Sequence, residues 1–109
     1  MEDIILTTTE FIPGYEITEI VGLAQGSCVQ TKSFGKDFGA GLKTLVGGEV
    51  RAYTDMMNES RQLSTKRMVD RARDLGADAI ICVRYSSSAV MQGAAEIMVV
   101  GTAVRIRKL

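Results

Sequence analysis

The stretch "DLGADAIICVRY", residues 74–85, holds the end of a helix and the start of a strand. Gly76 predicts the helix end, because glycine readily adopts the left-handed conformation that commonly follows a last helical turn. The residues that follow it, 77–88, are rich in Ile, Val and Ser and are typical of a strand. One face of this strand would carry Ala79, Ile81, Val83 and Tyr85, and the other Ile80, Cys82, Arg84 and Ser86.

Residues 49–75, before that glycine, predict one long helix. Its acidic start and its basic later turns suit the helix dipole. Lys66 and Asp70 have the spacing of an intrahelical ion pair, and a solvated face explains most of the charged residues. Residues three or four apart form one stripe that would pack on a sheet. These residues are Tyr53, Met57, Ser60, Ser64, Met68, Ala72 and Leu75.

Three more segments are expected to be strands: residues 3–8, 16–33 and 96–107. Pro13 followed by Gly14 predicts a turn after the first of them. Gly22 and Gly26 interrupt the second and indicate a bend or bulge. In the last strand, one face would carry Ile97, Val99, Gly101 and Ala103, and the other Met98, Val100, Val104 and Ile106.

The segments combine into an α+β fold, with a mostly antiparallel sheet packed on one long helix plus a short one. The short helix is expected within residues 34–49, where Phe and Leu recur at helical spacing despite several glycines. Gln92 and Gly93 would turn the chain between the last two strands. Both faces of that hairpin are largely apolar, and one helical layer covers only one face of a sheet. We therefore expect a partner subunit on the other face.

The composition favours one small domain, residues 1–109, and excludes several classes of function. Lys+Arg and Asp+Glu both total 13, whereas a general nucleic-acid binder needs a basic surplus. There is no apolar run long enough to cross a membrane and no secretory leader pattern. With two cysteines and no histidine, a secreted disulfide framework is not expected either. We expect a cytoplasmic protein with neither membrane nor nucleic-acid partners.

Cys28 and Cys82 are the only thiols, and they are far apart in the sequence. Soft metals prefer thiolates or imidazoles grouped at short spacing, so one subunit offers no recognisable soft-metal site. The favoured interpretation of Cys82 is a small packed residue in a strand. A thiol or metal role remains the alternative, with Cys82 residues gathered across a ring. Pairing of Cys28 with Cys82 across the sheet also stays open.

Three short pieces follow one another along the chain: "LVGGE" (45–49), "LGADAI" (75–80) and "GTAV" (101–104). By these pieces and their order, and by a likeness that covers nearly the whole chain, the sequence resembles the YbjQ-like family of small uncharacterised bacterial and archaeal proteins. The resemblance implies a small subunit with a sheet packed on helices, in a ring-forming, dodecin-like architecture of five subunits. The family is labelled putative heavy-metal-binding, and the resemblance implies no reaction and no cofactor beyond a metal ion.

One polar constellation stands out, and its positions are also recognisable in the family pattern: Asp37, Glu49, Tyr53, Arg61 and Glu96. Glu49 and Tyr53 are four residues apart and so share a helix face. Carboxylates paired with arginine are often structural, including at subunit contacts, and we favour that over a ligand site. The backbone at Gly47 and Gly48, where the long helix starts, is a weaker candidate for binding an anion.

The favoured function is a non-catalytic homo-oligomer that binds a small ligand or ion between subunits. The alternative is a heavy-metal-binding protein with cysteine or carboxylate ligands gathered across subunits. An enzyme is the weakest hypothesis, because a Ser or Cys nucleophile would lack a histidine base and no P-loop pattern is present.

Overall fold

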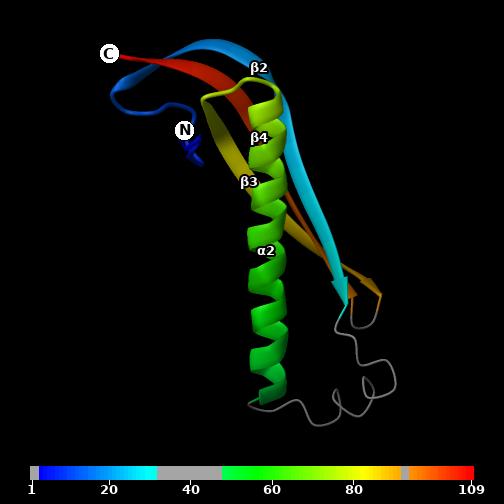
Figure 1. Ribbon diagram of the computed structural model, residues 1–109. Coiled ribbons are helices and arrows are strands. Elements are labelled where there is room, and N and C mark those ends of the chain that lie inside the picture. Colours follow the sequence, from blue (N-terminus) through cyan, green and yellow to red (C-terminus); the bar gives the residue numbers. More distant parts are fainter. Residues whose placement is uncertain (1–2, 32–47, 92–93) are drawn as a thin grey trace.

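The computed structural model describes residues 3–31, 48–91 and 94–109. Its elements are β1 (Ile5–Leu6), β2 (Tyr15–Thr31), α2 (Gly48–Asp74), β3 (Ala79–Met91) and β4 (Ala94–Lys108) (Figure 1). The strand order is β1-β3-β4-β2, and only the β1–β3 pair is parallel. The predicted α+β fold with a mostly antiparallel sheet is confirmed. The expected short helix within 34–49 and the turn at residues 92–93 lie outside the described residues, apart from the start of α2.

Helix α2 lies along one face of the sheet, over β2 and β4, and hardly touches β3 (Figure 1). Its buried side chains step by four along the helix: Met56, Ser60, Ser64, Met68 and Ala72. The prediction that Tyr53 and Met57 begin this stripe is wrong, because steps of four lead back from Ser60 to Met56. Tyr53 is 42% exposed.

The first core lies between α2 and the sheet and consists of Ala24, Met68, Ala72, Ile80, Val83, Val99 and Ala103. Gly26 lets the helix approach β2 at backbone distance. A Cβ at this position would be 2.1 Å from the carbonyl oxygen of Ser64 and 2.6 Å from the amide nitrogen of Met68. The sequence predicted a bend or bulge at Gly26, whereas its role is this close helix contact.

Strand β3 contains a bulge at Cys82, whose φ is +57°. The register with β4 shifts between Ile81 and Arg84, so β3 holds one extra residue there. As a result Ile80 and Val83 both face α2, while Ile81 packs on the opposite side. The predicted alternation, which placed Val83 on the face of Ile81, is therefore wrong after the bulge. Strand β2 also has two register shifts in its pairing with β4, one between Ile17 and Glu19 and one between Ile20 and Gly22. The second shift confirms the bend or bulge predicted at Gly22.

A second core lies on the face opposite α2 and consists of Ile12, Ala79, Ile81 and Val104. The N-terminal segment forms it by folding back along β3. The Thr7 amide donates to the carbonyl of Ile80, and the Val83 amide donates to the carbonyl of Thr7, both at 3.0 Å. This end of the sheet is therefore covered on both faces except along the β2 edge, where Ile20 and Leu23 stay exposed. We call it the closed half: residues 3–24, 79–83 and 101–108.

The other end, which we call the open half, comprises residues 25–30, 84–89 and 95–100 and has α2 on one face only. On the opposite face, Val29 is 58% exposed, and Leu23 and Ile20, at its border, are 62% and 70% exposed. Met98 and Val100 lie half-buried on the same face. These five residues define the uncovered face. Within residues 3–31, 48–91 and 94–109, no segment packs over it.

Candidate functional site

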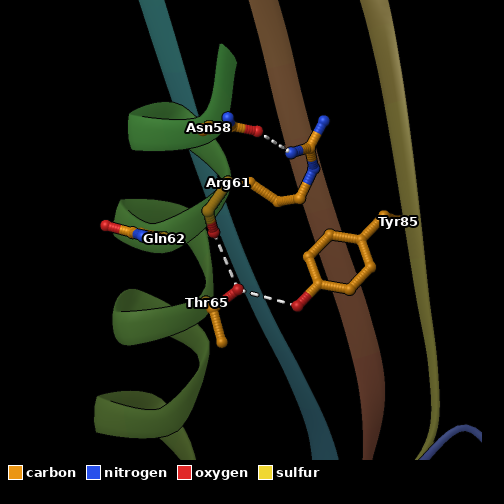
Figure 2. A pocket seen from close by; sticks show the side chains of 5 residues that line it. All are labelled: Asn58, Arg61, Gln62, Thr65 and Tyr85. Atoms are coloured by element: carbon orange, nitrogen blue, oxygen red, sulfur yellow. Dashed lines mark hydrogen bonds between the residues drawn. The ribbon is translucent and has the colours of Figure 1, made fainter. Parts of the chain in front are cut away.

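A groove of about 470 Å³ lies between α2 and β3 in the open half (Figure 2). It is lined by Asn58, Arg61, Gln62, Thr65 and Tyr85. The four helical residues share one face of α2, because they are spaced by three or four positions. The groove exists because α2 packs on β2 and β4 and leaves the adjacent side of β3 open.

A chain of hydrogen bonds holds the groove in shape (Figure 2). The Thr65 hydroxyl donates to the backbone carbonyl of Arg61 at 2.7 Å. Its single proton is then used, so the Tyr85 hydroxyl is the donor in the 2.8 Å contact between them. Arg61 donates to the side-chain oxygen of Asn58 at 2.7 Å, which leaves the Asn58 amide nitrogen as a further donor toward solvent.

The chemistry of this groove suits an anion. The Arg61 guanidinium pairs with a neutral amide and with no carboxylate among the described residues. It therefore leaves a positive charge, with N–H donors in a planar fork, beside a half-exposed tyrosine ring. The lining residues include no carboxylate that would compete with an anion for this guanidinium.

Only Arg61 from the predicted polar constellation lines this groove. Tyr53 lies two turns earlier on α2, and Glu96 lies half-buried on β4 between Val29 and Ser88. No hydrogen bond or ion pair joins Tyr53, Arg61 and Glu96 in the described structure.

The other predicted positions lie at the border of the described residues or beyond it. Gly48 and Glu49 form the start of α2, with side-chain surroundings outside the described part, and Asp37 and Gly47 lie wholly outside it. A ligand role for any of them stays a prediction.

Four lining residues were not predicted: Asn58, Gln62, Thr65 and Tyr85. The spacing of the three helical residues around Arg61 marks a polar face of α2, and this signal was available in the sequence. Tyr85 was not predictable as their neighbour, because the bulge at Cys82 decides which face of β3 it joins.

The sequence pattern of the YbjQ family, described as "Putative heavy-metal-binding", matches residues 4–107. The chain belongs to the YbjQ family. A UPF0145 protein of Clostridium novyi is 60% identical over 102 residues, which are 94% of this chain and 98% of that protein. A UPF0145 protein of Fervidobacterium nodosum is 55% identical over 105 residues, 96% of this chain and 97% of its own length.

A solved structure shares the fold of this YbjQ chain. It is a protein of unknown function from Pediococcus pentosaceus, assigned to the DUF74 family, with a TM-score of 0.70. The two chains are 16% identical, and the match covers 95% of this chain and 98% of the other. At this identity the likeness shows the fold alone. None of the helices in the described residues is long and apolar enough to span a membrane.

The two thiols of this YbjQ chain are free and lie on opposite faces of the sheet. Cys28 is buried on the α2 side of β2, next to Gly26 in the alternation of the strand. Cys82 is half-buried in the bulge of β3 and packs against the second core. A disulfide between them within one chain is therefore excluded by the sheet itself. The described residues also contain no group of three or more Cys, Asp or Glu side chains placed to hold a metal ion.

Proposed function

We propose that this YbjQ chain is a non-catalytic homo-oligomeric module of the cytoplasm, a ring of five subunits that binds a small ligand or ion at its interfaces. The observation that supports self-association is the uncovered face, where Leu23 and Val29 are exposed along β2 and the half-buried Val100 and Met98 lie beside the residues between them. Ile20, also exposed, lies further along the same strand. Monomeric proteins rarely expose contiguous apolar patches of this kind without a partner. Burying one such side chain contributes about 1.5–3 kcal/mol to association.

Size-exclusion chromatography with light scattering tests the assembly. At micromolar concentration, the full chain should elute at a multiple of its 11.8 kDa mass. Leu23→Lys with Val29→Lys should shift it toward the monomer, because two charges would enter the contact. Phe11→Ser, at an exposed residue of the closed half, is the matched control and should leave the mass unchanged. A wild-type monomer at this concentration would refute the proposal.

The ligand-binding part of the proposal rests on the groove at Arg61. A planar guanidinium with an adjacent amide donor recognises carboxylate or phosphate oxygens through two parallel hydrogen bonds. Thermal unfolding in the presence of acetate, benzoate or inorganic phosphate tests this directly. Stabilisation should saturate with at least one of these anions and should be lost in Arg61→Gln. Arg71→Gln, at an exposed arginine further along α2, should keep it. Equal shifts in both variants would contradict a site at Arg61.

The second candidate function is heavy-metal binding, which the description of the family favours. Because the two thiols of one chain lie on opposite faces of the sheet, a thiolate site would need cysteines from more than one subunit. Metal analysis of purified protein, with Cys82→Ser and Cys28→Ser beside it, tests this. Metal that disappears with one of the two substitutions would support the candidate. Negligible metal in all three proteins, even after incubation with zinc or copper, would end it.

A further inference from the structure

Asn58 holds the guanidinium of Arg61 in place without neutralising its charge. Arg61 Nη1 donates to the side-chain oxygen of Asn58 at 2.7 Å, and that oxygen belongs to a neutral amide. A guanidinium has several more N–H donors, which this bond leaves available to a ligand. An aspartate at residue 58 would instead form an ion pair with Arg61, because residues three apart on a helix are neighbours. Asn58 therefore orients a guanidinium that still carries the charge an anion needs.

The ring of Tyr85 forms the β3 wall of the same groove (Figure 2). Its hydroxyl donates to the Thr65 hydroxyl at 2.8 Å, which in turn donates to the backbone carbonyl of Arg61 at 2.7 Å. These two bonds tie the ring to α2. Tyr85 is half-exposed, and among the lining residues of the described chain it supplies the one aromatic ring. The groove therefore offers a fixed ring to an apolar part of a ligand.

The size and charge of the groove suit a small organic anion. Its volume of about 470 Å³ falls within the roughly 300–1,000 Å³ of clefts that bind small organic molecules. An acetate or phosphate ion would occupy the guanidinium and leave the Tyr85 ring in water. Arg61 is the one charged residue in the described lining, and it matches a carboxylate better than a phosphate monoester, which carries a charge of about −2.

We propose that this groove binds an aromatic carboxylate, with the carboxylate on Arg61 and the flat ring against Tyr85. A carboxylate accepts two parallel N–H bonds from a guanidinium, and aromatic rings pack on each other with an offset or edge to face. Asn58 and Thr65 are positioning residues, which orient the guanidinium and the ring. This inference rests on the anion site of the proposed function and names the class of its ligand.

Three probe anions test the ligand class on the full wild-type chain. Benzoate, cyclohexanecarboxylate and acetate all carry one negative charge at pH 7, but only benzoate has a flat aromatic ring. Saturation-transfer NMR at constant ionic strength gives the apparent dissociation constant of each. Benzoate should bind about fivefold more tightly than cyclohexanecarboxylate, because an aromatic pair gains more than burial of its area alone. Acetate, and inorganic phosphate measured by its displacement of benzoate, should bind more weakly than benzoate.

Two variants test the end of the groove that holds the carboxylate. Arg61→Gln should lose binding of all three carboxylates. Asn58→Asp should lose it too while staying folded by circular dichroism, because the new carboxylate would pair with Arg61. Arg71→Gln is the matched control and should bind all three as the wild type does.

Three further variants test the end that holds the ring. Tyr85→Leu should keep weak binding of all three carboxylates and lose the preference for benzoate. Thr65→Val removes the hydroxyl that fixes the ring and should reduce the preference. Thr65→Ser keeps the hydroxyl and should retain it. A merely structural role of Thr65 would leave the ratio of the two dissociation constants unchanged in both variants.

The outcomes separate the ligand class from the proposed anion site. No binding of any probe, or binding unchanged in Arg61→Gln, would overturn both. Equal affinities for the three carboxylates, all lost in Arg61→Gln, would overturn the aromatic ligand and leave the anion site standing. Tighter binding of phosphate than of benzoate, or a preference for benzoate that persists in Tyr85→Leu, would have the same consequence. If Tyr85→Leu does not fold, equal preferences in Thr65→Val and Thr65→Ser would overturn the placement of the ring.

Discussion

The two halves of the sheet differ in how completely one chain covers them. The closed half has α2 on one face and the N-terminal segment on the other, and its edges are bulged, charged or paired. The open half has the same strands and the same helix, but in the described chain one face and both edges are left without a partner. One chain thus encodes a self-sufficient end and an end that a second copy can complete.

The largest effect is expected at the contact that joins α2 to the open half. Gly26→Ala would place its Cβ against the backbone of α2, which can move only with the whole helix. We expect it to lower the free energy of unfolding by about 3 kcal/mol, the upper end of typical overpacking costs. Gly101→Ala is the counterpart in the closed half, where the added Cβ would be 2.5 Å from the Cγ2 methyl of the fully buried Ile80 and 3.1 Å from the carbonyl oxygen of Ile81. Repacking a buried side chain costs less than moving a helix backbone, so a smaller but clear loss is expected in urea unfolding. Equal losses would contradict the backbone contact at Gly26.

The bulge at Cys82 is the next target, because it sets the faces of β3. Cys82→Val places a β-branched residue at a positive φ, which we expect to destabilise the protein by about 2 kcal/mol. Cys82→Gly adopts that φ without strain and should stay within about 1 kcal/mol of the wild type, since it also loses some packing. Thermal unfolding measures both. A valine variant as stable as the glycine variant would show that the bulge does not depend on this conformation.

Two buried serines of α2 form a matched pair. The Ser64 hydroxyl donates to the carbonyl of Ile97 at 3.0 Å, so Ser64→Ala should lower the free energy of unfolding by about 1 kcal/mol. The Ser60 hydroxyl is equally buried and has no hydrogen-bond partner in the described structure. Ser60→Ala should therefore be neutral or stabilising in the same denaturation experiment. The opposite order of the two variants would refute this assignment.

The smallest effect is expected at the exposed ion pairs of the closed half, Arg107 with Glu16 and Arg105 with Glu19. Solvent and salt screen such pairs, so Glu16→Gln and Glu19→Gln should each cost about 0.5 kcal/mol or less. Repeating the urea titration in 1 M NaCl should remove most of that difference. A loss that persists in high salt would show that these residues stabilise the sheet by another means.

The sequence predicted those parts of the fold that depend on local pattern. The step of three or four residues located α2, and the glycine after residue 75 marked its end. The apolar runs located β3 and β4, and all three elements lie close to their predicted bounds. The faces of β3 could not be predicted beyond Cys82, because backbone bonds from Thr7 and Thr9 accompany that bulge. Alternation within one strand carries no information about contacts so distant in sequence.

The candidate site was predictable only in part for the same reason. Arg61 was identified from the helix, whereas Tyr85 reaches it through the position of β3 beside α2. Gly26 was recognised as an interruption, but its close contact with Ser64 and Met68 depends on where α2 crosses β2.

Amide hydrogen exchange of the full chain at two protein concentrations tests most directly whether a second copy completes the open half. Exchange at residues 25–30 and 84–89 should slow markedly when the concentration rises from nanomolar to micromolar, because paired edge amides are protected. Residues 79–83 and 101–108 should exchange at the same rate at both concentrations. Fast, concentration-independent exchange in both stretches in a protein that light scattering shows to be assembled would contradict the completion of the open half by a second copy.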